Sequence, residues 1–128
     1  MKQYIFLAFS IIVITFNSNA QSKDNPYAGK TFRIDNYIGD KLDNSEDLVF
    51  TNNEVEGSIC VQYGFKKAKY TTTINKKGLQ EFSCTMISKE HGKMVWTGEK
   101  NKNQISGKYL WTKEGQDPIQ YTFKGKIK

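Results

Sequence analysis

The sequence predicts an all-β protein, an eight-stranded antiparallel up-and-down barrel. The first observation is that apolar and polar residues alternate with a period of two, which is typical of strands with one buried and one exposed face. The second is that short segments with Gly, Asn or Pro separate these runs, and the third is that no stretch shows a helical period. Strands of this length and spacing favour a sandwich or barrel, and eight in a meander close into a barrel.

The clearest strands lie in the last third of the chain. Three of them are expected within residues 94–128, separated by turns near 100–103 and 114–118. Pro118 stands where a strand can only begin, because proline cannot donate to a sheet. In the final strand one face carries the apolar residues Ile119, Tyr121, Phe123 and Ile127 with Gly125, and the other carries Gln120, Thr122, Lys124, Lys126 and Lys128.

Five strands are expected before these three. A polar segment at 39–47, with Asp40, Asp43, Glu46 and Asp47, predicts an acidic, solvated loop after the first strand. The third strand is expected to carry Val55, Gly57, Ile59, Val61 and Tyr63 on one face. The expected strands cover residues 30–38, 48–50, 55–63, 68–74 and 79–88.

Two turns predict the register of their hairpins. Residues 75–78 (NKKG) are typical of a type I turn with glycine in the left-handed position, which places Cys84 opposite Tyr70 and Phe82 opposite Thr72. If residues 101–102 form a two-residue loop, Trp96 lies opposite Gly107, and the glycine leaves room for the indole.

The inward face predicted by this pattern is rich in aromatic residues. One interpretation is a packed aromatic core, and the other is a ligand cavity lined by aromatic rings; composition leaves both open. The candidate ligand-binding residues are Trp96, Tyr109, Trp111, Tyr121 and Phe123, with Tyr70 and Phe82 from the preceding hairpin.

Cys60 and Cys84 are an even pair, for which a disulfide is the default in an exported protein. The predicted register separates them by two strand spacings, about 9–10 Å, whereas a disulfide needs Cα atoms within about 7 Å. We therefore expect two free thiols. Two thiols without a nearby histidine also make a poor zinc site, and no metal site or cofactor is predicted.

The first twenty residues are typical of a signal peptide. Lys2 precedes an apolar run at 5–16, and the small residues Ser18 and Ala20 stand at the third and first positions before the expected cut. The run is too short for a stable membrane anchor. We expect a single barrel domain over residues 21–128 that is periplasmic or secreted and does not span a membrane once processed.

The composition disfavours nucleic acid as a partner. The chain carries 19 Lys and Arg against 13 Asp and Glu, for a net charge of +6, but Arg33 is its only arginine. The lysines are spread along the chain, as in a solvated surface that protects strand edges; attraction to an anionic envelope surface is the alternative. His91 is the only histidine and sits in a turn, and no residues arrange a catalytic pair, so no enzyme is predicted.

One group of motifs covers most of the chain after residue 47: residues 48–53 (LVFTNN), 57–65 (GSICVQYGF) followed by Tyr70, 95–98 (VWTG), 105–107 (ISG), 111–116 (WTKEGQ) and 118–125 (PIQYTFKG). Together these motifs resemble a family of small exported bacterial proteins that are lipocalin-like, or calycin-like, and mostly uncharacterised. The resemblance implies an eight-stranded barrel and no activity that could be assigned residue by residue. In that family pattern one cysteine is expected, where Cys60 stands.

These observations lead to two functional hypotheses. The first is an exported barrel that binds a small, partly apolar ligand. The second is a protein-interaction module, such as an inhibitor or an envelope assembly factor, built on a filled barrel with a protein partner in the cell envelope. They differ in whether the barrel interior is hollow, which composition does not decide because aromatic and β-branched residues can fill a small barrel.

Overall fold

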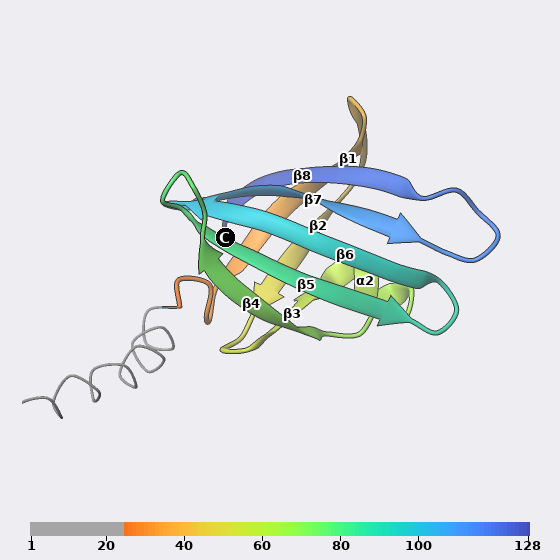
Figure 1. Cartoon of the computed structure of the whole chain (residues 1–128), viewed down its shortest axis with the longest axis horizontal. Coiled ribbons are helices and arrows are strands. Elements are labelled where there is room, and N and C mark those ends of the chain that lie inside the picture. The colour runs from red at the N-terminus through yellow and green to blue at the C-terminus, as the bar shows by residue number, and fades with distance from the viewer. Residues whose placement is uncertain (1–24) are drawn as a thin grey trace, which may run out of the picture.

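A computed structural model of the chain describes residues 25–128 (Figure 1). They form a closed antiparallel barrel in which each strand pairs with the next and β1 pairs with β8, so the predicted up-and-down barrel is confirmed. The predicted signal peptide lies outside the described residues. The strands are β1 (Thr31–Ile38), β2 (Lys41–Phe50), β3 (Glu54–Gly57), β4 (Ala68–Ile74), β5 (Gln80–Ser88), β6 (Gly92–Asn101), β7 (Gln104–Thr112) and β8 (Ile119–Ile127), and one helix, α2 (Ser58–Gln62), follows β3.

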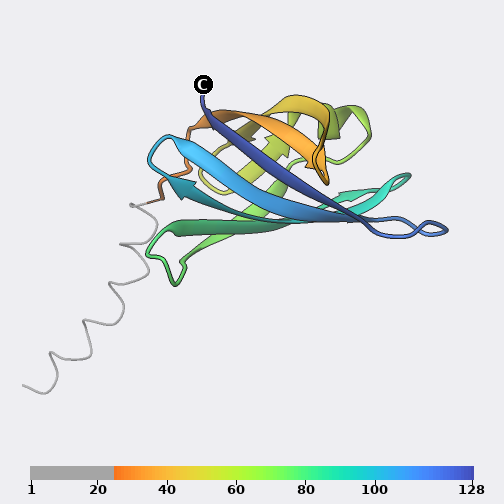
Figure 2. The ribbon, with the colours of Figure 1, turned by 90° about the horizontal axis from the view of Figure 1, so that it is seen from above.

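The two ends of the barrel are built differently. Residues 25–30 and the β4–β5 and β6–β7 turns lie together at one end, on the left in Figure 1. Helix α2, the β5–β6 turn and the long β7–β8 loop lie at the other end, where that loop projects beyond the barrel (Figure 2). We call the first the closed end and the second the mouth.

The closed end is filled by aromatic side chains. Tyr27 is fully buried and its ring packs against Phe32, Phe50 and Phe82, with centroids 6.4, 4.9 and 5.3 Å away. Its hydroxyl donates to the carbonyl of Gln80 at 2.7 Å. Residues 25–30 therefore act as a stopper that the strand pattern does not predict.

The predicted alternation holds in the second half of the barrel. Tyr121 and Phe123 are buried on β8, while Thr122 and Lys124 are exposed. The β4–β5 register is also confirmed, with Tyr70 paired to Cys84. Gly78 has a φ of +82° and its N–H donates to the carbonyl of Asn75, as the turn prediction requires.

The predicted acidic loop at 39–47 is wrong. Strand β2 begins at Lys41, and only the Gly39–Asp40 turn separates it from β1. Apolar alternation is missing here because the inward positions carry Asn44 and Glu46, which bond to a third polar residue instead of packing against apolar ones. Asn36 on β1 donates to both, at 2.8 Å each.

The predicted strand over 55–63 is also wrong beyond Gly57. Helix α2 replaces it, so Val61 and Tyr63 are 44% and 55% exposed whereas Cys60 is buried. Gly57 makes this turn possible, because a Cβ there would lie 2.5 Å from the Oε1 atom of Glu46. The sequence predicts no helix, and this prediction is wrong for the five residues of α2.

The β6–β7 register differs from the prediction by two residues. The two-residue turn is Lys102 and Asn103, so Trp96 pairs with Tyr109 and Gly98 pairs with Gly107. The shift of two keeps each side chain on its predicted face. The glycines make room for phenylalanine rings, since a Cβ on Gly98 would lie 2.6 Å from Phe82 and 2.8 Å from Phe123.

Within residues 25–128, no helix has the length and apolar character that crossing a membrane requires.

Candidate functional site

The mouth half of the barrel is not fully packed. It holds a cavity of about 620 Å³ whose wall comes from β2, α2, the segment after α2, the β5–β6 turn, and strands β6, β7 and β8. This cavity lies on the side of the barrel opposite Tyr27, because the strand ends that line it are those next to α2 and the β7–β8 loop. The barrel interior is therefore packed at one end and open at the other.

Stacked aromatic rings form one wall of the cavity. The ring of Tyr109 stacks on Trp96, with centroids 3.9 Å apart and planes at 22°, and on Tyr121 at 4.7 Å and 10°. The three residues are cross-strand neighbours on β6, β7 and β8, so the register of the sheet sets the stack. Tyr109 and Tyr121 line the cavity, and Trp96 lies behind them, fully buried.

A buried carboxylate faces the stack from β2. Glu46 is 1% exposed, and its Oε1 atom accepts the backbone N–H groups of Ile59 at 2.9 Å and Cys60 at 3.3 Å. Its Oε2 atom accepts from Asn36 at 2.8 Å. These bonds satisfy the charge in the interior and hold the start of α2 across the mouth.

Cys60 and Met94 place two sulfur atoms at the cavity wall. The Sγ atom of Cys60 lies 3.9 Å from the Oε2 atom of Glu46 and 4.0 Å from the Sδ atom of Met94. Burial, with the neighbouring charge of Glu46, raises the pKa of the Cys60 thiol. The thiol is therefore protonated at neutral pH and is a weak nucleophile.

Both cysteines are free thiols, in agreement with the prediction. The predicted position of Cys60 on a strand is wrong, because Cys60 belongs to helix α2 and points into the barrel. Burial raises the pKa of the Cys84 thiol to about 12.

The rim of the cavity is tied together by hydrogen bonds. The indole N–H of Trp111 donates to the carbonyl of His91 at 2.6 Å. The hydroxyl of Ser88 donates to the carbonyl of Tyr63 at 2.8 Å and accepts the N–H of His91 at 3.1 Å. The Tyr63 and His91 rings also meet edge to face, with centroids 5.7 Å apart. The segment after α2 and the β5–β6 turn therefore form one connected rim.

The structure divides the seven residues predicted as a ligand site. Tyr109, Trp111 and Tyr121 line the cavity. Trp96 supports the stack from behind. The others, Phe123, Tyr70 and Phe82, are buried in the aromatic packing below the cavity.

Sequence reasoning missed the polar and sulfur side of the cavity. Glu46, Cys60 and Met94 line it together with Tyr63 and Phe65. One signal could have found Glu46: it continues the inward alternation of Leu48 and Phe50 by two residues, which places its carboxylate inside the barrel.

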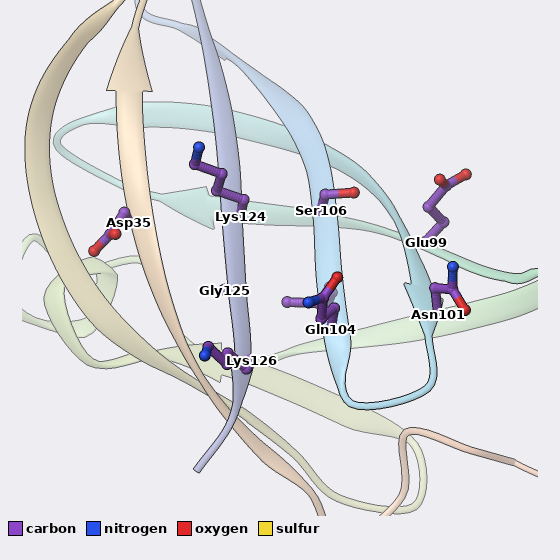
Figure 3. A pocket seen from close by; sticks show the side chains of 9 residues that line it. Asp35, Glu99, Asn101, Gln104, Ser106, Lys124, Gly125 and Lys126 are labelled. Atoms are coloured by element: carbon purple, nitrogen blue, oxygen red, sulfur yellow. The ribbon is translucent and has the colours of Figure 1, made fainter.

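A second depression lies on the outside of the barrel, over β1, β8, β7 and β6 (Figure 3). Its side chains, which include Asp35, Ser106, Lys124 and Lys126, belong to the outward faces of these strands. It measures about 470 Å³ and carries both signs of charge without a buried polar group. The lysine-rich exterior predicted for β8 is thus present, but it forms no enclosed site.

Among residues 25–128, the structure brings together no group of three or more His, Cys, Asp or Glu side chains that could hold a metal ion. Comparisons of the chain with protein-family models, with curated proteins and with solved structures gave no match in any of the three.

Proposed function

We propose that this protein is an exported barrel that binds a small, partly apolar molecule in the cavity at its mouth. The observation that carries the proposal is the division of the interior, which is packed around Tyr27 at one end and holds an open cavity at the other. A volume of about 620 Å³ lies within the range of about 300–1,000 Å³ that ligand pockets occupy. The signal-peptide pattern supports export.

The cavity wall indicates what the ligand would contact. Trp111, Tyr121 and the ring edge of Tyr109 offer aromatic surface, and the two tyrosine hydroxyls offer polar groups beside it. Asp43 and Lys113 stand at the opening with opposite charges. A ligand with a flat apolar body and one or two polar groups fits this wall best. The protonated Cys60 thiol supports binding rather than nucleophilic catalysis.

Trp111 provides a direct test because it is the tryptophan that lines the cavity. Titration with 1-anilinonaphthalene-8-sulfonate, an apolar aromatic probe, should change tryptophan emission saturably. Gln62→Phe, which adds bulk to the part of α2 that lines the cavity, should weaken the probe at least about tenfold by occupying its space. Lys108→Phe adds the same ring on the exposed face of β7 and should leave binding unchanged.

Non-saturable probe binding, or equal binding to both variants, would contradict the proposal. A protein-interaction role in the cell envelope is then the better hypothesis, and one observation favours it. Val95 and Leu110 are paired on the outer face of β6 and β7, and they are 44% and 37% exposed. Cross-linking in the envelope, with Val95→Lys as the variant that should abolish capture, tests this second candidate.

A further inference from the structure

The sulfur-containing side chains of the described chain gather in one part of the barrel. Residues 25–128 contain two cysteines and two methionines, and all four belong to α2, β5 and β6. Three of them are buried, and the fourth is half-buried at the cavity wall. The set is Cys60, Cys84, Met86 and Met94.

The register brings these residues together. Met86 on β5 pairs with Met94 on β6, and Cys84 lies two residues from Met86 on the same inward face. Cys60 approaches from α2, and its Sγ atom lies 4.0 Å from the Sδ atom of Met94. Of the four, only Cys60 and Met94 line the cavity. Their sulfur atoms therefore converge where an ion can reach them from the mouth.

The spacing of these two atoms suits a shared metal ion. A metal–sulfur bond is about 2.3 Å long, so one ion can join two sulfur atoms up to about 4.6 Å apart. The observed 4.0 Å lies within this reach. The Glu46 carboxylate, 3.9 Å from Cys60 Sγ, adds negative charge beside the pair.

The chemistry of the donors selects the ion. A thiolate with a thioether is a soft donor set, which favours Cu(I). Zinc takes nitrogen, thiolate and carboxylate ligands in sets of four, and the described residues provide no group of three such side chains. We propose that Cys60 and Met94 form a Cu(I)-binding site in the wall of the cavity.

Binding forms a copper–sulfur bond as the S–H bond of Cys60 breaks, and the proton passes to water. Copper enters and remains as Cu(I), so the step needs no electron donor or acceptor. The site does not depend on the proposed organic ligand, and its test uses the ion alone.

The test is a competition for Cu(I) between the reduced full-length protein and the coloured Cu(I)–bicinchoninate complex. The protein should withdraw about one Cu(I) per chain, seen as loss of the complex's absorbance. Cys60→Ser and Met94→Leu, which remove one sulfur ligand each and nearly preserve volume, should each weaken Cu(I) binding at least about tenfold.

The chain offers a matched control for each variant. Cys84→Ser and Met86→Leu remove the same chemical groups from residues that do not line the cavity, and they should keep Cu(I) affinity within about threefold of the original protein. Urea unfolding of each variant shows whether a loss of Cu(I) binding is caused by misfolding. If one ligand variant misfolds, the Cu(I) affinity of the other decides whether the site exists. No withdrawal of Cu(I), or equal losses in ligand and control variants, would overturn the site. Either result leaves the anilinonaphthalene titration unaffected.

Discussion

The carboxylate of Glu46 accepts the backbone N–H of Ile59 at 2.9 Å, and this bond joins β2 to the start of α2. The same carboxylate bonds to Cys60 N–H and to the Asn36 amide, so one side chain connects two strands and the helix at the mouth. These bonds explain how an acidic side chain is accommodated inside the barrel.

Replacing Glu46 by leucine should strongly destabilise the fold. The change leaves buried donors on Asn36 and α2 without their acceptor, which we expect to lower the free energy of unfolding by about 3 kcal/mol. Urea denaturation measures this. Glu90→Leu, on the exposed β5–β6 turn, is the control and should stay within about 0.5 kcal/mol. A Glu46→Leu protein as stable as the control would show that these bonds contribute nothing.

Stability should fall at alkaline pH. Thiols ordinarily ionise near pH 8.5 and phenols near pH 10, but burial raises the pKa of Cys60, Cys84 and Tyr109 in the folded protein. Between pH 8.5 and 10 the unfolded chain therefore holds fewer protons than the folded one, and the free energy of unfolding decreases as pH rises. Each ionising thiol contributes a slope of about 1.4 kcal/mol per pH unit.

Urea unfolding under reducing conditions at pH 7, 8, 9 and 10 would show this decline. The double variant Cys60→Ser, Cys84→Ser should lose most of it, because serine does not titrate in this range. An unchanged slope in the double variant would assign the alkaline effect to other groups.

The stopper can be tested at its hydroxyl. Tyr27→Phe removes the part-buried bond to the Gln80 carbonyl and should lower the free energy of unfolding by about 1 kcal/mol. Thermal unfolding followed by circular dichroism would detect it. Tyr37→Phe makes the same change on the outward face of β1 and should have no measurable effect. Equal midpoints for the two variants would contradict the role given to Tyr27.

The β6–β7 turn should accept a stabilising glycine. Lys102 has a φ of +59°, the one positive value on a residue other than glycine among residues 25–128. Glycine adopts this conformation without a Cβ penalty, so Lys102→Gly should raise the free energy of unfolding by about 1 kcal/mol. Lys76→Gly, in a turn position without positive φ, should lower it. Urea denaturation measures both midpoints. The prediction is wrong if both variants shift the midpoint in the same direction.

The sequence was sufficient for the strands whose inward residues are apolar. Alternation around Tyr121 and Phe123, and the glycine turn at Gly78, defined β4 to β8 and their faces closely. It failed where polar residues satisfy one another inside the barrel, because Asn44 and Glu46 give β2 the appearance of a loop. It failed again at α2, because a five-residue helix is too short to show a helical period.

The candidate site was half predictable for a related reason. Alternation tells which face a side chain takes, but it does not tell its depth along the barrel axis. Tyr109 and Phe82 therefore looked alike in the sequence, although one lines the cavity and the other packs under it. The sequence did not predict that Cys60 lines the cavity, because its inward direction depends on α2.

Tyr27 also determines the route by which the proposed ligand would enter and leave the cavity. Because this ring and its aromatic neighbours fill the closed end, the proposed ligand would have to leave through the opening by which it entered. Substitutions at Tyr63 or His91 on the rim would then change arrival and departure rates together, whereas substitutions at the stacked tyrosines would act on departure alone. The rim would thus set how fast the proposed ligand exchanges, and the stacked wall would set how tightly it binds.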